Sequence, residues 1–454
     1  MSPVFQAALA SWSFPPVATA LNLLFALLYL RGWIALRAGA APARFTIGRL
    51  SFFLSGLAIL EFALASPIDA FDPFFLTDHM LQHMLLMMFV PPLILLGEPE
   101  IPLLRGLPRW IALRIVGPIL GLKPMRTIGR TLVHPAVAWL LMALAMLGWH
   151  LPAAYELALR SPEWHEAEHI SFLVAATLFW WPVIQPWPSR SVWPRWTMPI
   201  YLLLADFVNS ALSAFLAFSD RVLYPSYLAM PRLWGISAQN DQVAAGAMMW
   251  VIGSFAFLIP AVVILVRLLS PAQPAPERPP APAATSRRIL MARSALAAMA
   301  VVLPIAALTY GWLVPDATDI DDAVLRVPQV SGPFRVSIFA PADPVQRGDC
   351  DVSVLVQDEN SKAPVMDADV TIAAQPLAGG NARFIRATHQ QSSNKLLSSA
   401  TIQLPNSGAW DLRVFVRRGS EEARLSAALQ VAQNHSMQAS NSLNPADPAR
   451  DSSR

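Results

Sequence analysis

The stretch SPEWHEAEHI, residues 161–170, holds the densest group of side chains suited to chemistry. His165, Glu166 and His169 fit H-E-x-x-H, the zinc metalloprotease signature, and Glu168 adds the inverted order H-x-x-E-H. A zinc protease needs a third protein ligand, and the following ISFLVAATLFWWPVI supplies no Asp, Glu or His. We therefore expect the two histidines to share a metal with residues of other helices. Glu166 is then expected to begin a helix or to support a ligand, and proteolysis is the weaker alternative.

A second stretch, DHMLQHMLLMM, places His79, His83 and Met87 at i, i+4 and i+8 on one face of a helix. A stripe of further methionines lies beside them: Met80, Met84 and Met88. Imidazole binds several metals, whereas a thioether selects soft ions, Cu(I) above all. A face that carries both predicts a copper site with Met87 among its ligands. The competing explanations are that methionine fills an apolar core and that a membrane histidine hydrogen-bonds between helices.

Membrane helices must position these side chains, because the composition is that of a membrane protein. Of the 454 residues, 55% are hydrophobic and 14% are charged, whereas a soluble domain is about one quarter charged. The mean hydropathy is +0.44. A helix needs about 20 apolar residues to cross a bilayer. Seven such runs precede a proline-rich segment and an eighth follows it, at about 17–36, 47–65, 79–97, 132–150, 169–185, 198–218, 242–268 and 289–314.

The expected fold is an all-α polytopic membrane helix bundle, with seven spans plus an eighth after a linker, followed by a small all-β sandwich domain. The β prediction rests on short alternating runs such as DVSVLVQD and WDLRVFVRR, which turn residues separate. The single cysteine, Cys350, excludes disulfides within the chain. The predicted parts are a seven-span domain at 1–269, a Pro/Ala-rich cytoplasmic linker at 270–288, the eighth transmembrane helix at 289–314, an exported β-sandwich at 325–433 and a disordered tail at 434–454.

The basic residues set the expected orientation. They collect in the loops between spans one and two, three and four, and five and six, and before span eight, whereas acidic residues collect in the other loops. The positive-inside rule then places the N-terminus and the β-domain on the outer, periplasmic side of a bacterial inner (plasma) membrane. No cleaved signal peptide is expected before the first span. The net charge of +3 does not indicate a nucleic-acid partner, because the charges lie in short loops beside membrane lipid.

Five histidines are expected to meet at the outer ends of the spans. His79 and His83 open span three, His150 closes span four, and His165 and His169 lead into span five. Ionisable side chains in spans usually face the bundle interior or a cavity. These five histidines are therefore the predicted metal ligands, together with the methionine that shares the face of the first pair.

Three further polar residues are expected to support this site. Asp241 and Gln242 begin span seven at its outer end, and Asp206 lies well inside span six. Each is expected to orient a ligand histidine by accepting its second ring N–H. For Asp241, capping of a helix is an equal alternative. Asp206 needs a partner, because a lone carboxylate inside a span is costly.

Four separated segments carry a resemblance to a known family: DHMLQHMLLMMFVPPLILLGEP, HPAVAWLLMALAMLGWHLPAAYELAL, HEAEHISFLVAATLFWWPVI and DQVAAGAMMW. From about residue 15 to 268 the chain resembles the polytopic CtaG family, the seven-span cytochrome c oxidase assembly factors. The histidine-rich motifs of that family match the five histidines named above. Its D-Q-x-x-x-G-x-x-x-W element matches Asp241, Gln242, Gly246 and Trp250.

The resemblance implies a non-enzymatic membrane protein that helps to mature a haem–copper oxidase, with copper, expected as Cu(I), as its metal. Cytochrome c oxidase subunits are the implied partners, and other copper chaperones are further ones. The C-terminal segment GAWDLRVFV resembles the end of a YtkA-like domain, a small exported β-sandwich for which we expect an interaction role.

Two other classes of function stay open. Histidines on neighbouring helices can bind haem axially, which would make the chain a haem-binding or redox membrane protein. A transporter would use Asp206 and the other polar groups inside the membrane, but the sequence has no convincing inverted repeat.

Overall fold

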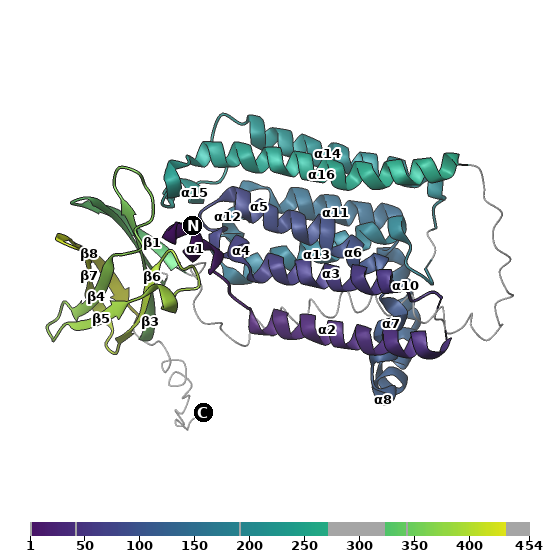
Figure 1. Cartoon of the computed structure of the whole chain (residues 1–454), viewed down its shortest axis with the longest axis horizontal. Coiled ribbons are helices and arrows are strands. Elements are labelled where there is room, and N and C mark those ends of the chain that lie inside the picture. Colours follow the sequence, from purple (N-terminus) through teal and green to yellow (C-terminus); the bar gives the residue numbers. More distant parts are fainter. Residues whose placement is uncertain (1, 41–42, 190–191, 271–322, 342–343, 433–454) are drawn as a thin grey trace, which may run out of the picture. The chain divides into compact units, whose positions relative to one another are not determined.

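The computed structural model describes residues 2–40, 43–189, 192–270, 323–341 and 344–432 (Figure 1). The described chain divides into a helical unit and a β-domain. The predicted eighth helix at 289–314, the linker beyond Ser270 and the tail at 434–454 lie outside the described residues. The boundaries expected for these parts stay predictions.

Six helices are long and apolar enough to cross a membrane. In chain order they are Pro16–Gly39, Ile47–Phe71, Leu76–Leu96, Pro162–Ile184, Arg195–Phe218 and Ala238–Leu269. The first consists of α2 (Pro16–Ala35) and the π-helix η1 (Leu36–Ala40), the second of α3 (Ile47–Ala65) and α4 (Pro67–Phe71), and the third of α5 (Leu76–Met84), the π-helix η2 (Leu85–Phe89) and α6 (Val90–Leu96). The fourth is α13, the fifth consists of η4 (Arg195–Thr197) and α14 (Met198–Phe218), and the sixth is α16. A seventh span would join α10 (Lys123–Leu132) to α11 (Pro135–Trp149), which are bent by 67° at the break between them. The predicted bundle is confirmed with six to seven candidate spans.

Short helices precede the first long helix or connect the long helices. They are α1 (Pro3–Leu9), α7 (Glu100–Gly106), α8 (Arg109–Ile111), the π-helix η3 (Ala112–Val116), α9 (Gly117–Gly121), α12 (Pro152–Ala158), α15 (Ser226–Ala229) and the 3₁₀ helix η5 (Leu233–Gly235).

The two helices that carry the histidine pairs extend beyond the predicted apolar runs. α13 begins at Pro162 and α5 at Leu76, whereas the apolar runs begin near residues 169 and 79. Proline is favoured in the first turn of a helix, because the N–H that it lacks has no partner inside the helix there. His165 and His169 therefore lie on the first two turns of α13, one helical turn apart, as their spacing predicts.

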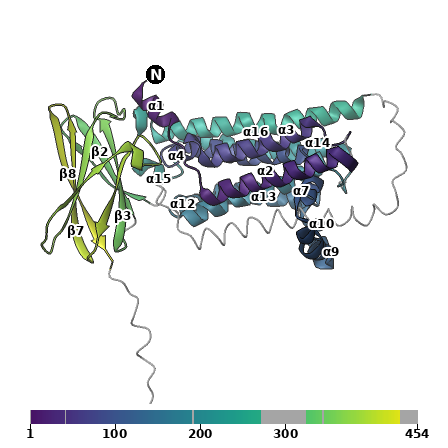
Figure 2. The ribbon, with the colours of Figure 1, turned by 60° about the horizontal axis from the view of Figure 1, so that its bottom comes forward.

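The packing of the long helices places α5 and α13 together. α14 and α16 lie side by side along their lengths (Figures 1 and 2). α16 also packs on α5, and α13 packs on η2, α6 and α11. The core between these helices is rich in methionine and aromatic residues, and the buried rings of Phe179, Trp180 and Phe257 contact one another. The two histidine-bearing helices are thus held by contacts along much of their length.

The β-domain consists of two four-stranded antiparallel sheets, with the strand orders β1-β2-β3-β6 and β5-β4-β7-β8. The strands are β1 (Ala323–Ser331), β2 (Phe334–Pro341), β3 (Gly348–Asp358), β4 (Asp369–Pro376), β5 (Arg383–Ala387), β6 (Ser398–Leu404), β7 (Gly408–Arg418) and β8 (Glu421–Val431). Along β7, Trp410, Leu412, Val414 and Val416 are buried and the residues between them are less so. This alternation, which buries one face of a sheet against the other, confirms the predicted β-sandwich (Figure 2).

Candidate metal centre

Two histidines one turn apart lie on the buried face of α5. His79 is 0% exposed and His83 is 2% exposed, and their ring centroids are 4.2 Å apart. α16 holds the start of this helix, because the Asp241 carboxylate accepts hydrogen bonds from the backbone N–H groups of Leu76 (2.8 Å) and Thr77 (3.1 Å). The first amides of a helix have no partner inside it and need such an acceptor. Asp241 thus caps α5 from another helix and sets the position of both histidines.

α13 presents a second face of metal-ligand side chains. His165, Glu168 and His169 are spaced by three and four residues and therefore share one side of the helix. The Glu168 side chain is 1% exposed, whereas Glu166 is exposed, because two residues along an α-helix turn the direction by about 200°. The structure places Glu168, rather than the Glu166 named from the sequence, in the buried group. The H-x-x-E-H spacing was the signal that pointed to it.

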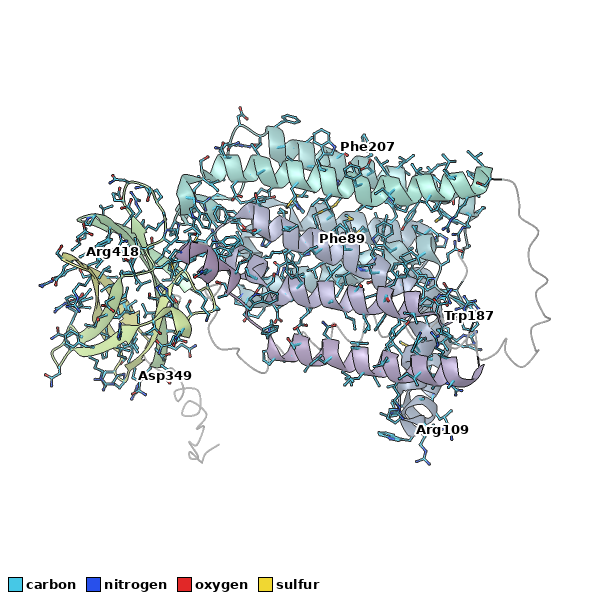
Figure 3. All side chains as sticks on the ribbon, in the orientation of Figure 1. Phe89, Arg109, Trp187, Phe207, Asp349 and Arg418 are labelled. Carbon is cyan, nitrogen blue, oxygen red and sulfur yellow. The ribbon has the colours of Figure 1, made fainter. Side chains whose placement is uncertain are left out.

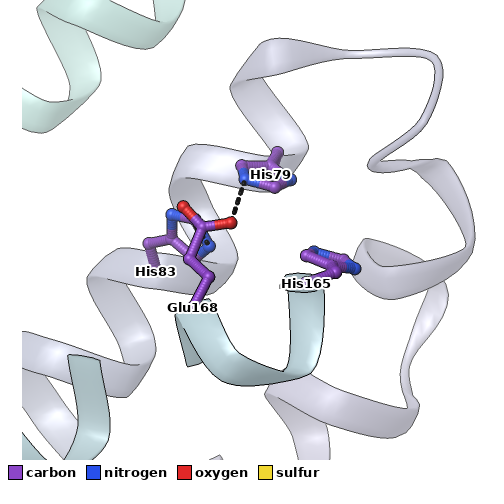
Figure 4. Close-up of side chains that lie close together, drawn as sticks. All are labelled: His79, His83, His165 and Glu168. Atoms are coloured by element: carbon purple, nitrogen blue, oxygen red, sulfur yellow. Dashed lines mark ion pairs between the residues drawn. The ribbon is translucent and has the colours of Figure 1, made fainter. Parts of the chain in front are cut away.

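Four side chains from these two faces converge, and we name them the His/Glu cluster (Figure 4). One ligand atom each of His79, His83, His165 and Glu168 lies within 4.8 Å of every other. Glu168 Oε2 is 3.8 Å from His79 Nε2, and Glu168 Oε1 is 3.9 Å from His83 Nε2. Figure 4 shows the Glu168 carboxylate beside the rings of His79 and His83. Histidines of both predicted pairs therefore meet in one buried place.

A second buried carboxylate, Asp72, lies beside the cluster. It follows the short helix α4, and its Oδ2 is 3.3 Å from His79 Nδ1 and 3.4 Å from His165 Nε2. The His79 ring therefore has one nitrogen toward Asp72 and the other toward Glu168. A carboxylate on the far nitrogen fixes the tautomer of a metal-binding imidazole. Asp72 is one of the acidic residues in the loops predicted to lie outside, and its spacing from His79 does not predict this contact.

Two tyrosines hold Asp72 and line the cluster. The Tyr227 hydroxyl donates to the Asp72 backbone carbonyl at 3.2 Å and lies 3.1 Å from the Tyr155 hydroxyl. Since Tyr227 has one hydroxyl proton and gives it to Asp72, Tyr155 is the donor to Tyr227. The Tyr155 ring centroid is 5.1 Å from that of His79. Burial raises the pKa of both phenols well above the ordinary value, so both stay protonated and can donate.

His169 and His150 lie near the cluster but outside the group of four. The His169 ring centroid is 4.3 Å from that of His165 and 5.2 Å from that of His83. His150 ends α11, and its Nδ1 lies 2.7 Å from the Met146 carbonyl, to which it donates. Burial lowers the pKa of His150 to about 4, so the ring is neutral at pH 7 and its Nε2 carries a lone pair. The ligand roles of both residues stay predictions.

The other side chains that were expected to support the site form hydrogen bonds with neighbouring helices and loops, and not with histidine rings. Asp206 accepts from the Ser254 hydroxyl at 2.9 Å and so joins α14 to α16. Gln242 accepts from the Leu223 backbone N–H at 2.8 Å and fixes the loop after α14. Within the described residues, neither these two side chains nor that of Asp241 hydrogen-bonds to a histidine. Their role in orienting a ligand histidine stays a prediction. The partner that a carboxylate inside a span needs is, for Asp206, the Ser254 hydroxyl.

Met87 lies in the π-helix η2, one turn beyond His83. Its side chain is buried in the apolar core, and its backbone carbonyl accepts from Trp180 Nε1 at 3.0 Å. π-Helical turns are rare and are frequent at functional sites. The ligand role of the Met87 thioether stays a prediction.

The buried donor atoms of the cluster suit a metal ion. Within the described residues, His79 Nε2, both ring nitrogens of His83 and both carboxylate oxygens of Glu168 have no hydrogen-bond partner. Each buried polar atom left unsatisfied costs about 1–3 kcal/mol, and a cation at their centre would satisfy several at once. Three imidazoles with one carboxylate suit borderline divalent ions such as Cu(II) and Zn(II), and imidazole also suits Cu(I).

A comparison with known protein families matches the chain over most of its helical unit. Residues 27–270 match the family model of the cytochrome c oxidase caa3 assembly factor, Caa3_CtaG. An uncharacterized protein of Mycobacterium bovis is 28% identical over 274 residues, which cover 59% of this chain and 40% of that protein. One of Mycobacterium tuberculosis gives the same values, and one of Mycobacterium leprae is 25% identical over 265 residues, 57% of this chain and 39% of that protein.

The match thus spans about two fifths of the length of these curated relatives. No solved structure matches the chain. The family model covers more than half of the 454 residues, including both histidine pairs and Asp241. The chain therefore belongs to the family of cytochrome c oxidase caa3 assembly factors.

Proposed function

We propose that this assembly factor binds a copper ion in the His/Glu cluster and passes it to a haem–copper cytochrome c oxidase, without catalysing a reaction itself. The observation that carries the proposal is the convergence of three imidazoles and one buried carboxylate, whose ligand atoms lie within 4.8 Å of one another. Membership of an oxidase assembly family supports the oxidase as the recipient. Copper is then a cargo that the protein must both hold and release.

The donors of the cluster suit copper in either oxidation state. Imidazole binds Cu(I) and Cu(II), a carboxylate favours the divalent ion, and a thioether such as that of Met87 favours Cu(I). We propose that copper arrives as Cu(I), for which the neutral histidines and Met87 suffice. Glu168 then allows the same site to hold Cu(II) as well.

The exposure of the ligands suggests an order of transfer. The His165 side chain is 12% exposed, whereas His79 and Glu168 are at most 1% exposed. We propose that His165 takes the ion first and that the buried donors receive it by ligand exchange, with release in the reverse order. A peptide would reach Glu168 only after α5 and α13 separate, which argues against the zinc protease alternative.

The positive-inside rule supports an outer position for the cluster. The basic loops predicted to be cytoplasmic include the segment before α11, which enters the bundle at the end opposite α4 and α12 (Figure 1). We propose that the N-terminus, the His/Glu cluster and the YtkA-like β-domain face the periplasm of a bacterial plasma membrane. Oxidase subunits and other copper chaperones are the proposed partners there.

Metal analysis of the purified protein tests the proposal. The double variants His79→Ala/His83→Ala and His165→Ala/His169→Ala should lose the copper that the wild type retains. His134→Ala, at the start of α11, is the matched control and should keep it. An absorbance spectrum of the same samples checks the haem alternative, since a Soret band would indicate bound haem.

The same variants test the function in cells. Each double variant should lower cytochrome c oxidase activity, and added copper should partly restore it. A fully assembled, copper-loaded oxidase in cells that carry the His79→Ala/His83→Ala variant would contradict the proposal.

A further inference from the structure

Residues 107–132, which we name the basic hairpin, leave the bundle at the end opposite α4 and α12 (Figures 1 and 2). The helices α8, η3 and α9 form one helical stretch from Arg109 to Gly121, and α10 follows after a bend at Leu122. α10 and α11 are bent by 67°. α10 therefore runs across the direction of the spans and not along it, as a helix in the plane of a membrane surface would.

The basic hairpin carries an uncompensated positive charge. It has five cationic side chains, and no Asp or Glu occurs between residues 100 and 156. The cationic residues are Arg109, Arg114, Lys123, Arg126 and Arg130. Among the described residues, no carboxylate forms an ion pair with any of them, and all except Arg126 are exposed. A surface of this kind attracts an anionic partner.

The charged and apolar side chains of α10 occupy opposite faces. At about 100° per residue, Lys123, Arg126 and Arg130 fall within an arc of about 60°, and Ile128 and Leu132 lie on the far side. A helix with a basic face and an apolar face is typical of segments that lie in the membrane interface.

Large apolar side chains are exposed on the rest of the hairpin as well. Leu113 is 74% exposed and Trp110 is 59% exposed, and Leu122 at the bend is also exposed. Several large apolar side chains exposed on one short segment indicate a contact with lipid or protein. The hairpin continues into α11 after a break of two residues, so its distance from the membrane surface is fixed by a candidate span.

We propose that the basic hairpin is an interfacial anchor that binds anionic lipids. Its apolar side chains lie among the acyl chains, and its five cations bind the phosphates of the leaflet at which α11 begins. An acidic protein surface would neutralise the cations but leave the apolar side chains without a matching partner. A lipid leaflet both neutralises the cations and surrounds the apolar side chains, and it is already present where α11 enters the membrane.

Spin labelling of the full-length protein tests the depth of the hairpin. Cys350→Ala removes the natural cysteine, and Leu113→Cys then carries the nitroxide in nanodiscs with or without phosphatidylglycerol. In phosphatidylglycerol discs the label should collide more often with oxygen than with an aqueous nickel chelate. Preferential collision with the nickel chelate in these discs overturns the proposal.

Lipid selectivity tests the role of the charges. The fraction of motionally restricted lipid should be larger for spin-labelled phosphatidylglycerol than for spin-labelled phosphatidylcholine. Replacing the five cations by glutamine should remove this preference, whereas exchanging arginine for lysine and lysine for arginine should keep it. An unchanged preference in the glutamine variant overturns the proposal, as does a Leu113→Cys label that is shielded only after an oxidase subunit is added. If the glutamine variant does not fold, two measurements still test the proposal: the lipid preference of the charge-preserving variant and the depth of the Leu113→Cys label.

Discussion

The carboxylate of Asp241 on α16 caps the first turn of α5 at Thr77. One oxygen accepts from the Thr77 backbone N–H at 3.1 Å and from its hydroxyl at 2.7 Å. The two residues are 164 positions apart in the chain, so this contact ties the last described span to the span that holds His79 and His83. The position of these histidines therefore depends on the carboxylate of a residue that belongs to another helix.

Asp241→Ala should therefore destabilise the protein and weaken copper retention together. Loss of a helix cap costs about 0.5–2 kcal/mol of unfolding free energy, and a frayed first turn would displace His79. Thermal unfolding in detergent and the copper content after gel filtration measure the two effects. Asn240→Ala, an exposed neighbour on α16, is the control and should change neither. A stable, copper-retaining Asp241→Ala protein would show that the cap does not position the site.

The sequence predicts well what depends on local periodicity. Faces of α5 and α13 follow from the i, i+4 spacing of the histidines, and the buried face of β7 follows from alternation. The sequence does not predict contacts that arise only when segments distant in the chain pack together. Asp72 meets His79 because α4 ends beside α5, and Asp241 reaches Thr77 because α16 packs on α5. Neither contact has a signal in spacing.

The choice between the two glutamates of H-E-A-E-H shows the same limit. Glu166 and Glu168 both lie on α13, on opposite flanks of the face that carries His165 and His169, and only Glu168 is buried. The packing of α13 against its neighbouring helices, and not the residue types or their spacing, separates the two.

Glu168→Gln should lower copper retention more than Glu166→Gln. Both substitutions remove one negative charge at nearly the same size, but only Glu168 is buried within the His/Glu cluster. The loss should be greater for Cu(II) than for Cu(I), because the divalent ion depends more on the carboxylate. Competition with chelators specific for each oxidation state measures this difference. Equal affinities for the two variants would exclude Glu168 as a ligand.

Tyr227→Phe should disturb the position of Asp72. The substitution removes the hydrogen bond to the Asp72 carbonyl and leaves the buried Tyr155 hydroxyl without its acceptor. We expect a loss of about 1–3 kcal/mol in unfolding free energy, as for a buried polar group that loses its partner. Tyr155→Phe/Tyr227→Phe removes both hydroxyls and should cost less than the sum of the single changes. Denaturant titration of the four proteins measures this coupling, and additive losses would contradict it.

The buried imidazole of His150 should make the metal-free protein less stable in mild acid. Its pKa in the folded state is about 4, lowered by burial from the ordinary 6.5, so the unfolded chain binds the proton more readily. Stability is therefore complete above about pH 6.5 and falls as the pH is lowered toward 4, by at most about 3 kcal/mol from this residue. His150→Gln should weaken this dependence by the share that His150 contributes. Melting temperatures at several pH values, with EDTA present and His134→Gln as the control, test it.

Gly106 should tolerate no side chain, because α7 crosses α2 at this residue. A Cβ at Gly106 would lie 1.9 Å from the Leu28 carbonyl oxygen, and one at Gly32 on the facing helix would lie 1.8 Å from the Pro102 carbonyl oxygen. These obstacles are backbone atoms, so the helices must separate. Gly106→Ala should cost about 1–3 kcal/mol or more, as overpacking of a tight core does.

Gly39→Ala is the matched control, since among the described residues no atom beyond its own helix backbone and chain neighbours lies within 4 Å of a Cβ there. Thermal unfolding of the two variants compares their effects directly. Copper retention should change little in either protein while it stays folded, because the α2–α7 contact lies apart from the His/Glu cluster. A Gly106→Ala protein as stable as Gly39→Ala would mean that α2 and α7 do not approach this closely in the membrane.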